Sequence, residues 1–281
     1  MSPAVLLQYV LPHRALSRIV YWATRWTFAP WKKFLIATII DKYAVDMSEA
    51  QEPDPAAYPT FNAFFTRALK PDARSAPADP AAIACPADGK ISQAGPVAAD
   101  ASNGGRIFQA KGFDYSAGEL LGDDAAAAPY VNGTFATIYL SPRDYHRVHM
   151  PLAGTLRETV HVPGRLFSVA PFTVEAVPRL FARNERLVCH FDGDQGPFAV
   201  VMVGAMLVSS VETVWSGLEI PPYASSITHK NWRDKHIRLE RFAEMARFNM
   251  GSTVVLLLPR VRPATFTVAA GDSVRVGQAI S

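Results

Sequence analysis

The sequence has few cysteines, a mild net charge and no apolar run long enough for a membrane span. Only Cys85 and Cys189 occur among 281 residues, which indicates neither a disulfide scaffold nor a cysteine zinc cluster and fits a reducing compartment. The uncharged stretch 196–211 is too short to span a bilayer, and its valines favour a buried strand. A net charge of +3 is too small to indicate nucleic-acid binding.

Two features are missing from the start of the chain. It has no short apolar core followed by a small-residue cleavage site, so we predict no signal peptide. It also has no acidic residue before Asp41. On a helix over residues 14–28, three arginines share one narrow face, while Leu16 and Ile19 lie on the opposite face and Trp26 lies at its edge.

This pattern is typical of a helix that lies in a membrane surface, with its arginines toward anionic headgroups. The alternative is an ordinary helix packed on the domain, with solvated arginines. A second apolar segment, 34–40, follows Pro30, and neither segment is long enough to span a bilayer. The cations expected to face the headgroups are Arg14, Arg18, Arg25, Lys32 and Lys33.

We predict an α+β fold. Residues 1–50 are expected to form membrane-associating amphipathic helices, and residues 51–281 a mostly antiparallel β catalytic domain, barrel-like or sandwich-like. From about residue 83, Gly, Pro and Asp turns alternate with β-branched and aromatic runs. Residues 60–69 suit a short capped helix, and residues 240–248 have a helical pattern. Strands are expected at 134–140, 155–162, 187–191, 199–208 and 265–268.

Two histidines follow a helix-start signal. Ser141 suits an N-cap, Pro142 the first helical position, and Asp144 the closing position of a capping box. On such a helix His146 and His149 would share a face, where they could ligate a metal, act as acid and base, or only pack. Zinc would need further ligands, and only His161 is near in sequence, so we predict no metal.

Two other short stretches contain reactive residue types. Asp88-Gly89 is a common turn pair, but a carboxylate there could also orient a histidine, as in serine-type triads. Gly251-Ser252 precedes a β-branched apolar run that is typical of a buried strand. The Ser252 hydroxyl could reach the Gly251 carbonyl carbon through a five-membered ring. Taken alone, each stretch is an ordinary turn or loop.

Short motifs spread over nearly the whole chain carry a more specific signal. They are Phe61 to Arg67 (FNAFFTR), Pro86 to Gly89 (PADG), Gln109 to Gly112 (QAKG), Tyr139 to Pro151, Leu166 to Val169 (LFSV), Leu180 to Arg186 (LFARNER), Glu212 to Trp215 (ETVW) and Gly251 to Thr253 (GST). In their order and number they make the chain resemble the pyruvoyl-dependent phosphatidylserine decarboxylase family. That family usually has Leu before the Gly-Ser pair, where this chain has Met250, and residues 221–241 look unlike the family pattern.

The resemblance implies a precursor that cuts itself between Gly251 and Ser252. His149, held by Asp88, would take the proton of the Ser252 hydroxyl, which attacks the Gly251 carbonyl to give an ester. Elimination would release the 1–251 β chain and leave dehydroalanine, which becomes the pyruvoyl cofactor at residue 252 of the 252–281 α chain. The two chains would remain associated. For the oxyanion donor of this step, Thr253 is a guess.

The resemblance also implies the reaction. The pyruvoyl group would form an imine with the amine of phosphatidylserine, carbon dioxide would leave, and phosphatidylethanolamine would result. His146 would handle the carboxylate or deliver the proton. The protein would lie at the cytoplasmic side of the cell membrane as a peripheral protein, with a homodimer as one option.

Two other functions stay open. A pyruvoyl enzyme could act on a soluble amino acid, although the basic amphipathic N-terminus argues against it. A lipoyl- or biotinyl-type carrier barrel is suggested by Ala270 to Gln278, but a carrier needs a modifiable lysine at a hairpin tip. No lysine follows Lys235, so this stretch favours shared architecture over shared function.

Overall fold

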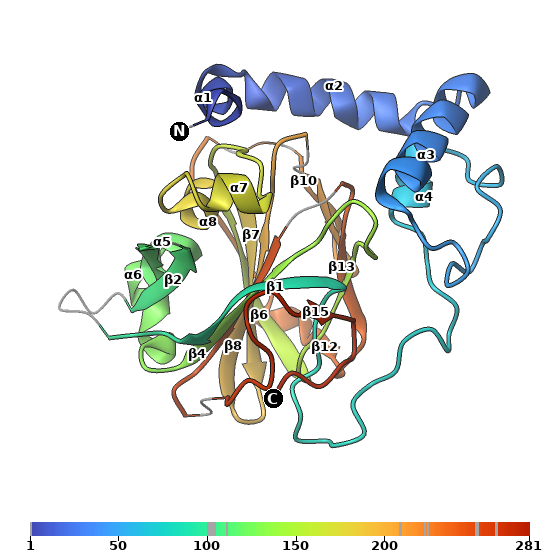
Figure 1. The fold of residues 1–281 in the computed structure, drawn as a ribbon. Coiled ribbons are helices and arrows are strands. Elements are labelled where there is room, and N and C mark those ends of the chain that lie inside the picture. Colours follow the sequence, from blue (N-terminus) through green and yellow to red (C-terminus); the bar gives the residue numbers. More distant parts are fainter. Residues whose placement is uncertain are drawn as a thin grey trace.

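The computed structural model describes residues 2–99, 105–110, 112–207, 210–221, 223, 225–250, 253–261 and 264–281. Helices at the N-terminus lie across one end of a mostly antiparallel β body (Figure 1). The predicted α+β class is therefore confirmed. The strands of the described part of the chain form open sheets, so the barrel-like alternative is not what the chain adopts.

The N-terminal region forms α1 (Pro3–Val10), α2 (His13–Arg25) and α3 (Ala29–Tyr43). Pro3 and Pro30 each stand in the first turn of a helix, where the missing N–H leaves no hydrogen bond unmade. Pro30 thus begins α3 rather than ending the previous helix, and α1 was not predicted. Among the helices that the structure describes, none has the length and apolar character to cross a membrane.

A large antiparallel sheet forms the centre of the molecule, in the order β11-β6-β7-β8-β14-β4-β1-β15, with β12 beside β6. β14 (Thr253–Leu258) lies inside it, hydrogen-bonded to β4 (Thr134–Tyr139) on one side and β8 (Gly196–Val203) on the other. The other strands are β1 (Gly89–Pro96), β6 (Gly154–Val162), β7 (Arg186–Gly193), β11 (Thr228–Asn231), β12 (Arg238–Leu239) and β15 (Ser273–Val274).

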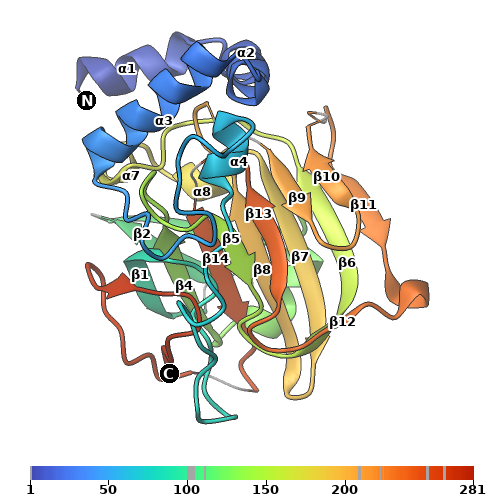
Figure 2. The same cartoon turned by 90° about the vertical axis from the view of Figure 1, so that its right-hand side faces the viewer.

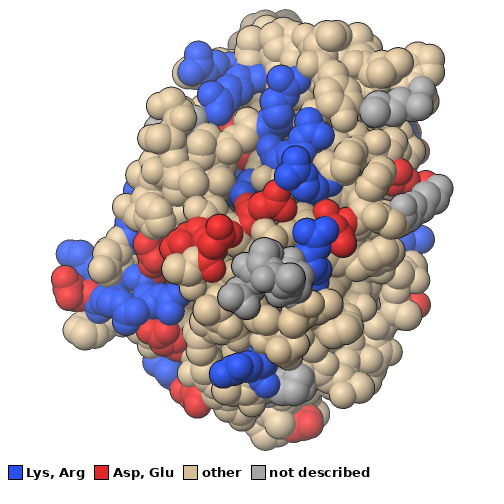
Figure 3. Space-filling model, turned by 90° about the vertical axis from the view of Figure 1, so that its left-hand side faces the viewer, with Lys and Arg blue, Asp and Glu red and all other residues tan. Residues whose placement is uncertain are grey.

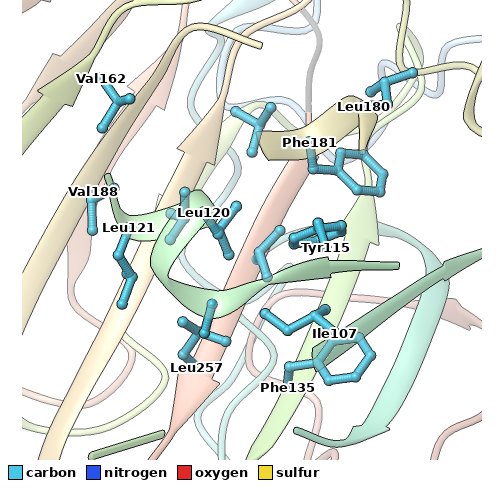
Figure 4. Close-up of a cluster of buried hydrophobic side chains, with 14 of the residues drawn as sticks. Ile107, Tyr115, Leu120, Leu121, Phe135, Val162, Leu180, Phe181, Val188 and Leu257 are labelled. Carbon is cyan, nitrogen blue, oxygen red and sulfur yellow. The ribbon is translucent and has the colours of Figure 1, made fainter. Parts of the chain in front are cut away.

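Both faces of β14 are buried, each in its own hydrophobic cluster. Val255 and Leu257 face a cluster that also contains Tyr115 and Phe181 (Figure 4). Val254 and Leu256 face a second cluster. A continuous apolar run suits a strand that is covered on both faces, because alternate side chains point to opposite sides. The first cluster is covered by β2 (Arg106–Ala110), β3 (Phe113–Ser116), α5 (Ala117–Leu121), α6 (Asp124–Ala127), η1 (Ala128–Tyr130), α7 (Pro171–Val174) and α8 (Leu180–Arg183).

A smaller antiparallel sheet covers the other cluster, in the order β10-β9-β13-β5 (Figure 2). Its strands are β5 (Arg147–His149), β9 (Val211–Thr213), β10 (Gly217–Ile220) and β13 (Glu244–Phe248). The chain leaves this small sheet at the end of β13 and enters the large sheet at β14. The short η2 (Arg233–Lys235) lies between β11 and β12 in sequence.

The predicted capped helix with an aromatic face is α4 (Phe61–Phe65), although it is shorter than expected. Thr60 caps it, because its hydroxyl accepts a hydrogen bond from the Ala63 N–H at 3.1 Å. Its phenylalanines pack with Ile36 of α3 and with Tyr58, which ties the N-terminal helices to the region of the small sheet.

Several local predictions are wrong. Residues 244–248 form strand β13 and not a helix, because both β5 and β9 pair with them. The expected helix after Ser141 is a turn closed by the Asp144 N–H on the Ser141 carbonyl at 2.9 Å. Residues 265–268 form no strand. The strand predicted at 199–208 ends at Val203, and Val208 lies outside the described residues.

Candidate active site

The predicted scissile pair, Gly251-Ser252, lies outside the described residues, but both of its flanks are fixed. On one side, the side-chain amide of Asn249 donates to Ser210 Oγ and to a Glu212 carboxylate oxygen, each at 2.9 Å. On the other side, Thr253 begins β14 and is fully buried. The pair therefore bridges the end of the small sheet and the start of the central strand.

The two neighbours of the pair have unusual features. Met250 has a φ of 149°, a backbone conformation that side-chain-bearing residues rarely adopt. The Thr253 hydroxyl is buried and has no hydrogen-bond partner among the described residues. A buried hydroxyl without a partner is costly, so such groups tend to mark sites where a ligand or a reacting group arrives. This is the residue that the sequence analysis offered as an oxyanion donor.

His149 lies on β5, and its ring is held at both nitrogens. Nδ1 lies 2.7 Å from the Phe242 carbonyl oxygen, which can only accept, so Nδ1 carries the proton. In the neutral ring Nε2 is therefore the basic atom, and it lies 3.1 Å from the Tyr145 hydroxyl. Burial lowers the pKa of His149, which favours this neutral form. His149 is thus built as a base that is unprotonated near neutral pH.

Asp88 lies in the bend that leads into β1. This bend is next to β5, because the His149 N–H donates to the Pro86 carbonyl at 2.8 Å. Its carboxylate accepts hydrogen bonds from Arg74, with Nε at 3.0 Å, and from the Val276 N–H at 2.7 Å. The hydrogen-bond partners of the Asp88 side chain thus do not include His149. Asp88 is near enough for its charge to oppose the lowering of the His149 pKa.

The group that holds the His149 ring at Nδ1 is thus the Phe242 carbonyl, where we expected Asp88 to hold His149. Phe242 holds this carbonyl with a left-handed φ of 72°. No sequence signal could have found it, because the contact comes from a backbone atom whose position depends on the fold. The same holds for Arg74, which lies in a Pro- and Asp-rich connecting region.

His146 is in a different environment from His149. It is fully buried, and its ring stacks on Phe65 of α4 with centroids 4.0 Å apart. Burial, helped by the nearby charge of Arg67, lowers the pKa of His146 to about 3, so this ring is also neutral near pH 7. Neither ring nitrogen has a well-formed hydrogen bond among the described residues.

The two histidines do not share a face, as a helix would have required. His149 lies in β5 and His146 just before it, so the three-residue spacing places them on opposite sides of an extended chain. The prediction of a common face is wrong because β5 pairs with β13 over Arg147–His149, and this pairing overrides the local helix signals. One ring faces the aromatic surface of α4 and the other faces Phe242 and Tyr145.

Within the described part of the chain, no group of three His, Cys, Asp or Glu side chains is placed to hold a metal ion. His161, which had been considered as a third ligand, instead contacts the buried Glu185 with Nε2 at 2.8 Å. The side chains of His149, His146 and Thr253 offer acid, base and hydrogen-bonding chemistry.

Comparison with known proteins identifies the family. Residues 61–281 match the family model described as phosphatidylserine decarboxylase, and residues 3–44 match a second model described as PSD. A phosphatidylserine decarboxylase proenzyme of Xanthomonas euvesicatoria pv. vesicatoria (strain 85-10) is 65% identical over 283 residues, which cover 100% of this chain and 99% of the relative. The proenzyme of Stenotrophomonas maltophilia (strain R551-3) is 58% identical over 282 residues, with 100% and 99% covered. The chain belongs to the phosphatidylserine decarboxylase family.

Proposed function

We propose that this protein converts phosphatidylserine to phosphatidylethanolamine and carbon dioxide, after cutting itself between Gly251 and Ser252. The observation that carries the proposal is the full-length match to relatives whose names describe them as proenzymes of this activity. The described neighbours of the pair support it, because the Asn249 side chain is held by Ser210 and Glu212, and the buried Thr253 hydroxyl is free among the described residues.

Cutting begins with the Ser252 hydroxyl, which is a poor nucleophile unless a base removes its proton. We assign this role to Nε2 of His149, which the Phe242 carbonyl holds in the basic tautomer. The Ser252 oxygen then attacks the Gly251 carbonyl carbon, and the acyl group moves from nitrogen to oxygen as an ester. Loss of the α-proton of residue 252 expels the Gly251 carboxylate and leaves dehydroalanine. Water converts it to a pyruvoyl group and ammonia.

In this assignment Asp88 acts through its charge. Its carboxylate is held by Arg74 and the Val276 N–H, so it stays fixed near His149 without a direct hydrogen bond. A nearby negative charge stabilises the imidazolium that forms when His149 takes the proton. Thr253, whose buried hydroxyl is free among the described residues, is a donor for the negative oxygen that develops during the attack.

The surroundings also fit the pyruvoyl group that cutting would leave at residue 252. This group supplies an electrophilic carbonyl that withdraws electrons from the carbon losing carbon dioxide. The chain's own contribution is a water-poor site: Thr253 is fully buried and His146 is stacked beneath Phe65. A neutral His146 can accept or return a proton, and we assign it to the substrate carboxylate and the final protonation.

The two pieces are expected to remain one folded unit after the cut. Residues 253–258 of the small chain form β14, which is hydrogen-bonded to β4 and β8 of the large chain. The tail adds β15 beside β1, and the Ile280 N–H donates to Ile83 at 3.0 Å. Pulling the small chain out would break a central strand and both hydrophobic clusters.

The first prediction concerns the cut itself. Ser252→Ala should give one uncut chain without decarboxylase activity, because it lacks the attacking oxygen. An intact-mass spectrum of wild-type protein should show two chains broken after Gly251, the smaller blocked at its N-terminus. Ser210→Ala, which removes a nearby hydroxyl that only holds Asn249, serves as the control and should still be cut. Normal cutting of Ser252→Ala would refute the scheme.

The second prediction separates the histidines. His149→Ala and Asp88→Ala should both fail to mature, since they remove the base and the charge that supports it. His146→Ala should still be cut, at least in part, but should turn over phosphatidylserine poorly. A gel for cutting and a carbon dioxide assay on the same samples measure both effects. Maturation of His149→Ala together with an uncut His146→Ala would mean that the two roles are reversed.

The third prediction concerns pH. Burial lowers the pKa of His149 below the ordinary value of 6.5, so the base form persists into mildly acidic solution. The rate of cutting should therefore fall as pH is lowered, with a midpoint below 6.5. Ser252→Thr, whose extra methyl should slow the attack, would provide uncut protein in which to time the reaction on a gel from pH 5 to 8. A midpoint above 6.5 would mean that the charge of Asp88 raises the pKa of His149 by more than burial lowers it.

We further propose that α1 and α2 bind a membrane surface, with their apolar sides toward the lipid. The apolar side of α2 faces outward. His13, Ser17 and Thr24 are buried against the protein, while Ile19 and Trp22 are 65% and 73% exposed. Large apolar side chains that are exposed from α1 through α3 are Leu6, Leu7, Val10, Ile19, Trp22, Trp26, Phe28 and Phe34. So many exposed large apolar side chains in one region favour an interaction site.

Arg14 and Arg25 of α2 lie near carboxylates of the protein, but Arg14 and Arg18 are exposed, so their contact with headgroups stays a prediction. Arg14 Nε lies 3.7 Å from Glu185, and Arg25 lies 3.9 Å from Glu212 and stacks on Tyr21. Lys32 donates to the Ala56 carbonyl at 3.1 Å. Basic side chains gather in the upper part of the face drawn in Figure 3, nearest the N-terminal helices, and would attract anionic lipid.

The active site lies close below these helices. Ser17, Tyr21 and Arg25 of α2 line one small cavity together with Asn249 and Met250, which directly precede the predicted cut. A lipid headgroup would then have a short path from the bilayer surface to residue 252. This supports a peripheral protein whose substrate is itself a membrane lipid; the cytoplasmic side and a homodimer remain predictions.

The fourth prediction tests this surface. The double variant Ile19→Glu and Trp22→Glu should lose sedimentation with anionic vesicles while still being cut, because it places charge on the apolar face only. Val261→Glu changes a residue that is 71% exposed beyond the far end of β14, so it should bind vesicles like the wild type. Equal sedimentation of all three proteins would exclude α2 as the membrane contact.

A further inference from the structure

A cavity of about 500 Å³ opens beside Asp88, and not every charged side chain that lines it has an oppositely charged partner among the described residues. Four arginines line it, namely Arg67, Arg74, Arg143 and Arg275, together with four carboxylates. Tyr145, the hydrogen-bond partner of His149, also lines it. The cavity is therefore next to the groups proposed for cutting, yet none of the steps above uses its arginines as ligands for substrate.

Each carboxylate in the cavity already has partners. Arg74 binds Asp88 and lies 2.9 Å from Glu49, which also binds Arg275 at 2.7 Å. Asp144 accepts from the Ser141 N–H at 2.6 Å and lies 3.7 Å from Arg143 Nε. Asp46 accepts from the Ser48 N–H at 2.8 Å. These contacts account for three of the arginines.

Arg67 is the remaining arginine, and it makes no ion pair with the described residues. It is only 4% exposed. Nη2 donates to the Arg143 carbonyl at 3.0 Å, but Nε and Nη1 have no hydrogen-bond partner in the part of the chain that the structure describes. Burial lowers the pKa of Arg67, which reflects the cost of keeping this charge away from water. A buried cation whose N–H groups have no acceptor destabilises the folded state unless a ligand accepts hydrogen bonds from it.

The position of Arg67 ties this free charge to the active site. Phe65, two residues earlier, stacks on His146 at 4.0 Å, and the adjacent Thr66 carbonyl accepts from Arg147 Nε at 3.0 Å. The segment 64–67 therefore runs along 143–147. The charge of Arg67 is also one of the groups that act on His146.

We propose that Arg67 binds an oxyanion of the substrate headgroup, either the carboxylate or the phosphodiester, at the mouth of this cavity. The proposal rests on the proposed function. Guanidinium groups suit both ligands, since their planar N–H groups can donate to two oxygens of a carboxylate or a phosphate. An anion bound here would lie in the cavity that Asp88 and Tyr145 also line. Arg67 thus becomes a specificity-determining residue of the same site.

Binding should be measured on the full-length chain carrying Ser252→Ala, so that neither cutting nor turnover is needed. The probe is glycerophosphoserine, the water-soluble headgroup, and calorimetry measures its binding. Arg67→Met should weaken its binding by about tenfold or more, the usual loss for a hydrogen bond to a charged group. Arg143→Met, which removes an exposed charge from the same cavity, should change binding by less than about twofold.

Two further probes identify the anion. If glycerophosphoethanolamine binds as well as glycerophosphoserine and depends equally on Arg67, the phosphodiester is the ligand. If only glycerophosphoserine depends on Arg67, the carboxylate is the ligand. Either result supports the proposal. Arg67-dependent binding of inorganic phosphate, with no binding of either headgroup probe, would overturn the assignment to substrate.

Folding is checked by the melting temperature. Arg67→Met should melt no lower than its parent, because it replaces an unpaired buried cation by an apolar chain of similar length. If it does melt lower, the binding of glycerophosphoserine is compared between the parent and Arg67→Lys instead. This variant keeps the charge but loses the planar donors, so it should bind several-fold more weakly. Unchanged binding in both variants would remove Arg67 from the site. A wild-type protein that binds the headgroup but releases no carbon dioxide would contradict the proposed function alone.

Discussion

The pairing of β14 with β4 and β8 is the constraint on which the rest of the structure depends. All six residues of this strand are buried, and its two faces enter two separate hydrophobic clusters. The strand starts one residue after Ser252, so the predicted cut lies at the edge of the most firmly held element of the fold. After a cut at the predicted position, the new end would remain joined to this paired strand.

The two histidines show how burial and hydrogen bonding divide their roles. His146 is fully buried and stacks on an aromatic ring, so its neutrality comes mainly from desolvation, with a smaller effect of the Arg67 charge. His149 is also desolvated, but a carbonyl fixes its tautomer and a phenol contacts its basic nitrogen. Burial also raises the pKa of that phenol, Tyr145, so it remains a donor. Both rings are neutral near pH 7, yet only His149 has a defined direction for proton transfer.

In the N-terminal region, α2 contacts the protein through basic residues and exposes large apolar side chains. The catalytic body presents the carboxylates of Glu185 and Glu212 to α2, and these attract the arginine face. The apolar face is then left outward, which is unfavourable in water and becomes favourable when a lipid surface covers it. The proposed membrane contact would cover these apolar residues, while Arg14 and Arg25 contact the protein.

Much of this protein was predictable from its residues alone. The apolar run 253–258, the capped aromatic helix at Phe61 and the alternation of turns with strands follow from local patterns, because side-chain burial repeats with the period of each element. The motifs around Asp88, His146, His149 and Gly251-Ser252 were enough to indicate the family. Tertiary structure alone decided the rest. It turned the segment around His149 into a strand by pairing it with β13, and it placed the Phe242 carbonyl beside Nδ1. It also paired Asp88 with Arg74 and left Ile19 and Trp22 of α2 exposed. These outcomes depend on contacts between residues far apart in the chain, which no local pattern contains.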